Sequence, residues 1–304
     1  MTTFVFPGQG SQFVGMSKDF YENFTIAKTT FEEIEDYTKI NLKEIIFEDN
    51  KNKLNLTNYT QIAIFTASLS IFKTYQNEKD LKLDSINTML GHSLGEYSAL
   101  ACSEKLSLKD CSIILKQRGE LMNSAIKPNE TGMAALIGLS ASEVQNIIDK
   151  NNLNIQIAND NSQMQIVVSG NHINLDQSMP IFLDNKIKKF IKLNVSAAFH
   201  SNYMLEAQKN LSIEIDKLNF IQNNVNIVSN FNAKISNENL DIKESLKNQM
   251  SNKVRWTESI INLEKYGENS IIEIGPGKIL SGLIKRISPN FAIKTVNSIS
   301  DLDN

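Results

Sequence analysis

Short apolar runs that alternate with helical stretches are the feature that most constrains the fold of this 304-residue chain. Strands that are separated by helices favour a mostly parallel sheet with helices on both faces. The chain therefore predicts an α/β domain of three layers, in which the sheet lies between two layers of helices. The runs that we expect to form its strands are Thr3–Phe6, Ile86–Leu90, Val225–Ser229, Ser270–Ile274 and Ala292–Val296.

The stretch from residue 126 to 198 has a different pattern of predicted elements, in which strands are more frequent. A helix start of the capping-box type, at Ser140 and Glu143, follows its first strand, and the predicted order is βαββαβ. This order is that of the ferredoxin-like split unit. We expect an inserted ferredoxin-like subdomain at 126–198, which divides the main domain into the segments 1–125 and 199–304. Its predicted strands are Met133–Leu139, Asn154–Ala158, Gln165–Ser169 and Lys189–Val195, with the second helix near Ile173–Asn185.

Composition and charge argue against several classes of function. The chain holds 31 basic and 34 acidic residues, so its net charge of −3 gives no overall positive field for a nucleic acid. Its longest uncharged apolar stretch, Ile62–Phe72, has about half the roughly 20 residues that a membrane span needs, and we expect a core helix there. The two cysteines, Cys102 and Cys111, cannot build a disulfide framework, so we expect a reduced, cytoplasmic protein.

The sequence GHSLG at 91–95 is the strongest local motif. It directly follows the apolar run Ile86–Leu90 and directly precedes a helix-like segment, Glu96–Lys105. A nucleophile elbow requires this context of strand, turn and helix, because the two glycines allow the close backbone approach that leaves the serine projecting above the sheet. The motif predicts that Ser93 is a nucleophile in a hydrolase-like main domain, and a purely structural glycine turn is the alternative.

A serine nucleophile needs a base, and a neutral imidazole is the usual one. The chain has three histidines. His92 adjoins the serine at a tight turn where neighbouring side chains diverge, so we expect it to support the elbow. His172 falls among polar turn residues at the edge of the inserted subdomain, which favours a solvated surface role. His200 lies where the chain re-enters the main domain, a place where clefts form, and elimination leaves it as the predicted base for Ser93.

Two glycine-rich loops lack the spacing of nucleotide-binding motifs. In the loop Gly8–Gln12, a GxGxxG fingerprint would need glycine at Phe13. In Gly275–Lys278, the lysine is not followed by serine or threonine as in a P-loop, so we interpret this segment as a strand-to-helix turn. We expect the first loop to form one wall of an oxyanion hole, with a backbone N–H near Gln12 beside that of Leu94, and a plain turn is the alternative.

Arginine is scarce in this chain, which uses lysine at nearly every other basic position. An arginine in such a chain indicates a need for the planar fork that grips a carboxylate in two places. Arg118 lies on the helical segment that follows the elbow helix. It either faces Ser93 or lies on the surface, which is the common place for an arginine.

Several ordered motifs together give a resemblance that spans essentially the whole chain. The chain resembles the malonyl-CoA:acyl carrier protein transacylases of fatty-acid synthesis and the acyltransferase domains of polyketide synthases. A set of this length is far more specific than GxSxG alone. The motifs are FPGQGSQ at 6–12, GHSLGEYSAL at 91–100, QRG at 117–119, AFHS at 198–201, VSNFNA at 228–233, QM at 249–250 with VRW at 254–256, and EIGPGKIL at 273–280.

The resemblance implies a role for each of the matching polar residues. Ser93 would be the acylated nucleophile, His200 its general base, and Arg118 the partner of the free carboxylate of malonate. Gln12 and Leu94 would supply the N–H groups of the oxyanion hole.

The resemblance also implies how the base is held and which acyl group is preferred. A main-chain carbonyl at the position of Gln249 would orient His200, so that a dyad replaces the usual triad with its acid. A branched apolar residue after the serine, here Leu94, and a phenylalanine before the histidine, here Phe199, go with malonyl rather than methylmalonyl units. One departure is visible: Gln163–Met164 stands where a Pro-Gly or similar pair is usual, which affects the shape of that loop.

The implied reaction transfers the malonyl group from malonyl-CoA to the phosphopantetheine thiol of acyl carrier protein through a malonyl-serine ester. No cofactor and no metal are expected, because the coenzyme A thioester and the phosphopantetheine are substrates. A monomer is expected, with no nucleic-acid or membrane partner. Acyl carrier proteins are acidic, so a local basic patch is expected, for which Lys186, Lys188, Lys189 and Lys192 are candidates; a solvated edge strand is the alternative.

Three other functions remain open at this point. The first is a serine esterase or thioesterase that uses the same elbow with water as the acceptor. It would need an acidic triad member between Ser93 and His200, and no segment there contains a recognisable candidate. The others are a trans-acting polyketide acyltransferase and a non-catalytic module that docks carrier proteins.

Overall fold

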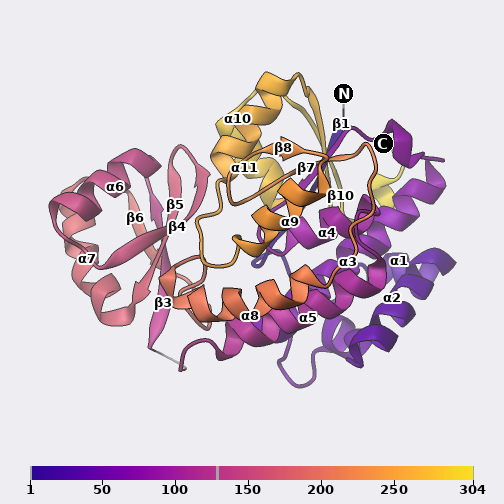
Figure 1. Cartoon of the computed structure of the whole chain (residues 1–304), viewed down its shortest axis with the longest axis horizontal. Helices are drawn as coiled ribbons and strands as arrows, with labels where there is room; N and C mark the ends of the chain where they lie inside the picture. The colour runs from indigo at the N-terminus through magenta and orange to yellow at the C-terminus, as the bar shows by residue number, and fades with distance from the viewer. Residues whose placement is uncertain (1, 128–129, 304) are drawn as a thin grey trace.

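The computed structural model describes residues 2–127 and 130–303, which contain two separate sheets (Figure 1). In the described residues, the larger sheet has six strands in the order β10-β9-β1-β2-β7-β8, and all its neighbouring pairs are parallel except β7 with β8. The strands are β1 (Thr2–Phe6), β2 (Thr88–Gly91), β7 (Asn226–Val228), β8 (Ile235–Ser236), β9 (Ser270–Ile274) and β10 (Ala292–Val296). The predicted α/β fold with a mostly parallel sheet is confirmed, and each predicted run contributes a strand. The short strand β8 is an addition that the sequence pattern did not indicate.

Helices cover both faces of this sheet (Figure 1). The α-helices are α1 (Lys18–Asn23), α2 (Thr25–Thr38), α3 (Thr57–Glu78), α4 (Gly95–Cys102), α5 (Leu108–Ser124), α8 (Leu205–Asp216), α9 (Asn239–Lys247), α10 (Trp256–Tyr266) and α11 (Ile279–Ile287). Short 3-10 or π segments are η1 (Glu44–Glu48), η2 (Leu83–Ser85), η3 (Asn202–Met204) and η4 (Ile299–Asp301).

Alternation of side chains along the strands divides the core between the two faces of the sheet. Phe4 and Phe6 of β1 belong to a hydrophobic cluster that includes residues of α2, α3, α4 and α5. Val5, which lies between them, and Leu90 of β2 belong to a second cluster with α10 and α11. Successive side chains of a strand point to opposite faces, so a strand that is apolar throughout requires a layer of helices on each side.

The smaller sheet is antiparallel and has the order β4-β5-β3-β6 in the described residues. Its elements follow one another as predicted: β3 (Thr131–Ile137), α6 (Ala141–Lys150), β4 (Ile155–Ser162), β5 (Gln165–Asn171), α7 (His172–Asp184) and β6 (Lys189–Lys192). The capping box at the start of α6 is present, since Ser140 Oγ accepts from Glu143 N–H and the Glu143 carboxylate accepts from Ser140 N–H. Gln163–Met164 forms the turn between β4 and β5, so the departure from the family's pattern lies at a hairpin tip.

Strand β3 joins the small sheet to the main core. Ala134 and Leu136 face the cluster under α6 and α7, whereas Met133 and Ala135 belong to the core of the large domain. Strand β4 makes a second connection, because Asp160 N–H donates to the carbonyl of Val254 at 2.9 Å, and Val254 N–H donates to that of Ala158 at 2.9 Å. These contacts fix the small sheet beside the carboxyl end of β2.

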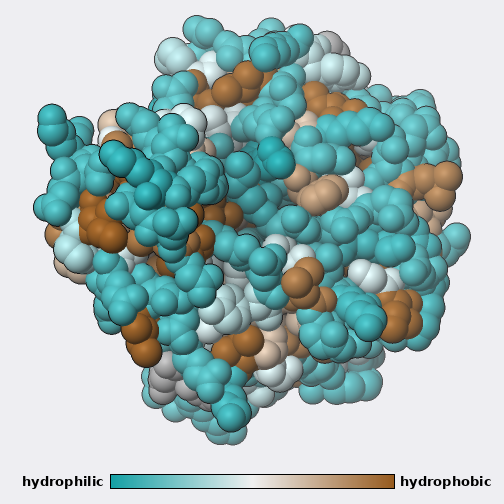
Figure 2. All heavy atoms as spheres, turned by 60° about the vertical axis from the view of Figure 1, so that its left-hand side comes forward, coloured by the Kyte–Doolittle hydropathy of each residue, from teal (hydrophilic) through white to brown (hydrophobic). Residues whose placement is uncertain are grey.

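Figure 2 shows one face as largely hydrophilic, with hydrophobic side chains in small, separate groups. Within residues 2–127 and 130–303, no helix combines the length and the apolar character that a membrane crossing requires.

Helix α3 contains the apolar stretch for which a core helix was expected. Every residue from Thr60 to Phe72 is buried, and the helix packs against α2, α4 and α5. Two polar members of the stretch return their hydroxyl groups to the helix backbone: Thr66 Oγ1 donates to the carbonyl of Ile62 at 2.7 Å, and Ser70 Oγ donates to that of Ala67 at 2.9 Å. This stretch of the helix is therefore buried on all sides and contains no charged residue.

The substitution Ile64→Ala should lower the free energy of unfolding by about 2–5 kcal/mol, because it removes fully buried methyl groups and leaves a cavity. Urea unfolding, followed by circular dichroism, measures this change. The matched control is Ile173→Ala on α7, where the side chain is 65% exposed and the expected change is within about 0.5 kcal/mol. Equal effects at the two sites would contradict the burial of α3.

Candidate active site

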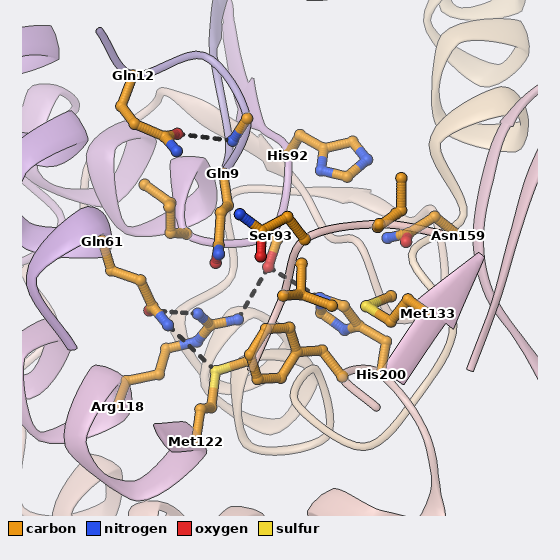
Figure 3. Close-up of a pocket in the computed structure, with 16 residues that line it drawn as sticks. Gln9, Gln12, Gln61, His92, Ser93, Arg118, Met122, Met133, Asn159 and His200 are labelled. Carbon is orange, nitrogen blue, oxygen red and sulfur yellow. Dashed lines mark hydrogen bonds between the residues drawn. The ribbon is translucent and has the colours of Figure 1, made fainter. Parts of the chain in front are cut away.

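A cavity of about 270 Å³ lies between the carboxyl ends of β1 and β2 and the small sheet (Figure 3). Its walls come from the loop after β1, the turn after β2, helices α3 and α5, strands β3 and β4 of the small sheet, and the segment that follows β6. All the residues with a predicted role line it, except Gln249. They are Gln12, His92, Ser93, Leu94, Arg118, Phe199 and His200, and other lining residues are Gln9, Gly10, Gln61, Met122, Met133, Asn159, Leu193, Asn194 and Val195.

The turn between β2 and α4 has the geometry of a nucleophile elbow. Ser93 has a φ of 53°, in the left-handed region that non-glycine residues rarely adopt. A Cβ at Gly91 would lie 1.9 Å from the carbonyl carbon of Gly95, and one at Gly95 would lie 2.3 Å from the carbonyl oxygen of Phe6. Only glycine fits at both positions, and the tight packing directs the Ser93 hydroxyl into the cavity (Figure 3).

Asn230 holds the elbow by two hydrogen bonds. Its Oδ1 accepts from the backbone N–H of Ser93 at 2.6 Å, and its Nδ2 donates to the carbonyl of Gly91 at 2.7 Å. The N–H of Ser93 is thereby occupied. The next N–H, that of Leu94, lies at the start of α4, where the leading N–H groups of a helix have no acceptor within the helix.

Ser93 and His200 are in direct contact, although 107 residues separate them. The distance between Ser93 Oγ and His200 Nε2 is 2.8 Å. His200 Nδ1 lies 3.1 Å from each of two main-chain carbonyl oxygens, those of Gln249 and Asn252. Carbonyl oxygens only accept hydrogen bonds, so Nδ1 carries the proton and Nε2 presents its lone pair to the serine hydroxyl.

The environment keeps His200 neutral. Burial lowers the pKa of His200 to about 3, and the nearby positive charge of Arg118 acts in the same direction. The two carbonyl contacts raise the pKa but do not reverse this shift. At neutral pH the imidazole is therefore free to accept a proton from the serine.

Arg118 is 1% exposed and lies on α5. Its Nη2 donates to Ser93 Oγ at 3.0 Å and to Gln249 Oε1 at 2.9 Å, and its Nη1 donates to Gln61 Oε1. The guanidinium also lies over the ring of Tyr97, 5.5 Å from the ring centre. Within the described part of the chain, its hydrogen-bond acceptors are all uncharged oxygens. A buried cation that is hydrogen-bonded only to neutral groups is suited to an anionic ligand.

The other predicted residues differ in how they take part. Leu94 and Phe199 line the cavity. His92 Nε2 lies 2.8 Å from Asn161 Oδ1, and its ring packs on Trp256. Burial lowers the pKa of His92, so this ring too is neutral. These contacts agree with the expected supporting role.

Gln12 lines the cavity, but its side chain points away from Ser93 (Figure 3), and the part of its backbone N–H in the oxyanion hole stays a prediction. Its side chain accepts from Gly10 N–H at 2.8 Å and donates to Asn55 at 2.9 Å, which keeps it at the rim. Gln9, from the same loop, points toward Ser93 instead (Figure 3). The chain turns between these two residues, since Gly10 has a φ of 103° and Ser11 N–H donates to the carbonyl of Gly8 at 3.4 Å.

Several polar residues of the site were not predicted from the sequence. Gln61 gave no signal, because it lies within an apolar helical stretch. Glu96 and Asn230 stand in motifs that were recognised, but their contacts depend on the packing of distant segments. Among residues 2–127 and 130–303, no group of three or more His, Cys, Asp and Glu side chains is placed to hold a metal ion.

An elbow serine in contact with a neutral histidine and a buried arginine defines a site suited to acyl transfer. The family model described as "Acyl transferase domain" matches residues 3–292, and the chain belongs to this family.

Individual relatives extend this assignment over nearly the whole chain. The malonyl CoA-acyl carrier protein transacylase of Bacillus subtilis (strain 168) is 39% identical, over 98% of this chain and 93% of its own length. The polyketide biosynthesis malonyl CoA-acyl carrier protein transacylase PksC of the same organism is 34% identical, over 94% of this chain and 97% of its own length. Among solved structures, the malonyl CoA-acyl carrier protein transacylase of Clostridium perfringens has a TM-score of 0.93 at 34% identity, over 99% of this chain and 95% of that one. The structure PlMCAT:AntF, a type II polyketide acyl-carrier protein in complex with its malonyl-transacylase, contains a chain that also has a TM-score of 0.93. This chain is 31% identical, over 99% of the present chain and 97% of its own length.

The substitution Gly95→Ala should disrupt the elbow, because the added methyl group would overlap the carbonyl of Phe6. We expect a loss of about 2–4 kcal/mol in the free energy of unfolding, at the upper end for single substitutions, and a loss of serine reactivity. Urea unfolding and labelling with a fluorophosphonate probe measure the two effects. Gly282→Ala on α11, where nothing lies within 4 Å of the added Cβ, is the control and should be neutral or stabilising. Normal labelling of Gly95→Ala would contradict the tight packing described here.

Proposed function

We propose that this chain transfers the malonyl group of malonyl-CoA to the phosphopantetheine thiol of an acyl carrier protein, in support of fatty-acid synthesis. The observation that carries the proposal is the position of Arg118, whose Nη2 lies 3.0 Å from the same Ser93 oxygen that contacts His200. In a malonyl thioester, one methylene separates the carboxylate from the reacting carbonyl. A cation for that carboxylate must therefore lie beside the nucleophile.

The first half-reaction forms the acyl-enzyme. His200 Nε2 takes the proton of the Ser93 hydroxyl while Oγ bonds to the thioester carbon. The resulting oxyanion is held by the N–H of Leu94 and by an N–H of the loop Gly8–Gln12, near Gln12, and each such donor typically supplies about 2.7–4 kcal/mol. The carbon–sulfur bond then breaks, and the coenzyme A sulfur takes the proton from His200.

The second half-reaction reverses these steps with another thiol. The phosphopantetheine thiol gives its proton to His200 Nε2 as its sulfur attacks the malonyl-serine ester. The bond to Ser93 Oγ breaks, and this oxygen recovers the proton. Each proton and each charge is handled by a group of the chain or of the substrates, so we propose that no resident cofactor takes part.

Arg118 has a second part in this scheme. Its Nη2 donates to the Ser93 oxygen and engages a lone pair that the attack requires. A substrate carboxylate competes for the same N–H, and charge-assisted bonds are about twice as strong as neutral ones. Binding of the malonyl group therefore frees the Ser93 hydroxyl. An acetyl group has no carboxylate, so Arg118 stays hydrogen-bonded to Ser93 Oγ.

An acyl carrier protein is the proposed second substrate. A structural relative has been solved with its own acyl-carrier protein, which supports this choice. The basic patch of Lys186, Lys188, Lys189 and Lys192 lies at β6, an edge strand of the small sheet, and Lys192 is paired with Asp176 there. This edge remains our candidate for carrier docking.

We also propose finer descriptions of the fold. The strand order β4-β5-β3-β6 with two helices on one face supports a ferredoxin-like unit at 126–198. The elbow after a parallel strand supports a hydrolase-like domain at 1–125 and 199–304. The chain would act as a monomer, because every proposed catalytic group comes from one copy.

Incubation with malonyl-CoA should add one malonyl group to the wild-type chain, and intact-mass analysis measures it. Ser93→Ala should lose the adduct, because the attacking oxygen is gone, and the control Ser98→Ala on α4 should keep it. Wild-type chain that releases coenzyme A without an adduct and without a carrier would point to hydrolysis, the thioesterase alternative. A polyketide carrier that accepts the group faster than a fatty-acid carrier would favour the polyketide alternative, which the identity to PksC supports.

Arg118→Ala should lower kcat/KM for malonyl-CoA by about 100-fold, since charged hydrogen bonds contribute about 1.5–3 kcal/mol each. The ratio of acetyl to malonyl transfer should rise at the same time. Competition between the two thioesters, read by mass, measures this ratio. Arg286→Ala, at an exposed arginine of α11, is the control and should leave the ratio unchanged. An unchanged ratio in Arg118→Ala would remove the proposed basis of selectivity.

A further inference from the structure

Glu96 is a buried carboxylate directly beneath the elbow. It lies on α4, three residues after Ser93, and its side chain is 0% exposed. Its Oε2 accepts from Gln249 Nε2 at 2.7 Å and from the backbone N–H of Asn230 at 3.1 Å. Its Oε1 is buried and has no hydrogen-bond partner among the described residues. Burying a carboxylate in this way is costly, so the residue requires an explanation beyond packing.

Both partners of Glu96 hold reacting groups. Asn230 fixes the elbow through the N–H of Ser93 and the carbonyl of Gly91. Gln249 donates through Nε2 to the carbonyl of Ser93 at 2.9 Å. Its Oε1 accepts from Arg118, and its main-chain carbonyl accepts from His200 Nδ1. One carboxylate oxygen therefore joins the two residues that support the nucleophile, the base and the cation.

The amide of Gln249 can be placed in two ways, and only one suits the site. In the observed orientation, the NH₂ group faces Glu96 and the Ser93 carbonyl, which only accept, and Oε1 faces Arg118, which only donates. The flipped amide would point its NH₂ group at the guanidinium. Arg118 would then lose an acceptor and turn away from Ser93.

We propose that Glu96 is a positioning residue: its ionised carboxylate holds Gln249 and Asn230 so that Arg118 and His200 both face the Ser93 hydroxyl. Two measurements test this inference, and only one of them, the rate of acylation by malonyl-CoA, rests on the proposed function. It assigns no contact between Glu96 and the substrate.

The charge of Glu96 makes this arrangement sensitive to pH. Burial raises the pKa of Glu96 to about 7, against the opposing effects of Gln249, Asn230 and Arg118. The charged and titratable groups that interact with it are Arg118 on α5 and Tyr97 on α4, and His200 is linked to it only through Gln249. Below about pH 7 the carboxyl gains a proton and one oxygen becomes a donor. The grip on its two N–H partners weakens, while His200, with a pKa near 3, does not titrate in that range.

The test compares Glu96→Gln with Glu273→Gln. Glu273 is a matched control, because it is also a buried carboxylate that accepts from two N–H groups, those of Leu280 and Ser281, but lies outside the cavity. Two rates are measured from pH 5.5 to 9: acylation by malonyl-CoA in a single turnover, and labelling of Ser93 by a fluorophosphonate probe. The second rate needs no malonyl group.

In wild-type chain, both rates should fall as the pH is lowered through about 7. Glu96→Gln should be slower by about ten- to a hundredfold at pH 8 and flat from pH 5.5 to 8, because its amide imitates the protonated acid at every pH. Glu273→Gln should keep the wild-type profile. Wild-type rates with the same fall toward acid in Glu96→Gln would overturn the inference.

The two readouts separate this inference from the proposed function. If wild-type chain forms no malonyl adduct but labelling depends on Glu96, the positioning role stands and the malonyl transfer does not. If malonylation occurs and neither rate changes in Glu96→Gln, the malonyl transfer stands and the positioning role does not. Should Glu96→Gln fail to fold, Glu96→Asp takes its place. Its shorter side chain keeps the charge but reaches fewer donors, so both rates should drop while the fall toward acid remains, and wild-type rates in this variant would overturn the inference.

Discussion

The close contact between the start of α4 and the end of β1 is the constraint on which the site depends. Gly95 presses against the carbonyl of Phe6, in a central strand that β2 and β9 hold on both sides. This contact leaves one path for the chain between them, and Ser93 must take a positive φ on that path. The strain of order 1–3 kcal/mol at Ser93 is offset by packing and by the two hydrogen bonds of Asn230. Every other group of the site is brought to this fixed serine.

The use of main-chain carbonyls behind His200 follows from the presence of Arg118. A carboxylate at Nδ1 would orient the imidazole equally well and would favour its charged form. It would also place a second anion near the buried guanidinium. The carbonyls of Gln249 and Asn252 fix the tautomer without a net charge, so the positive charge of Arg118 stays available to a ligand. The missing acid of the triad is thus a consequence of the cation beside the nucleophile.

The sequence predicted the framework of the fold because its signals are local. Strand runs, the glycines of the elbow and the capping box at Ser140 all depend on neighbouring residues, and the structure contains each of them. Ser93, His200 and Arg118 were found by their chemistry and by motif order, and the structure brings them together. Which side chains of the loop Gly8–Gln12 face the serine depends on the backbone turn at Gly10, which periodicity does not reveal.

The hydrogen bonds between the polar residues that support the site could not be predicted from the sequence, for a different reason. Gln249 and Glu96 are 153 residues apart, and their bond exists only because the segment after α9 returns to α4. The same return sets the carbonyl that holds His200 and the amide that holds Arg118. In the proposed reaction, activation of the nucleophile and recognition of the acyl carboxylate therefore share one residue. A disturbance at Gln249 would then affect the proposed proton acceptor, His200, and the proposed carboxylate binder, Arg118, together, so that rate and selectivity would be coupled.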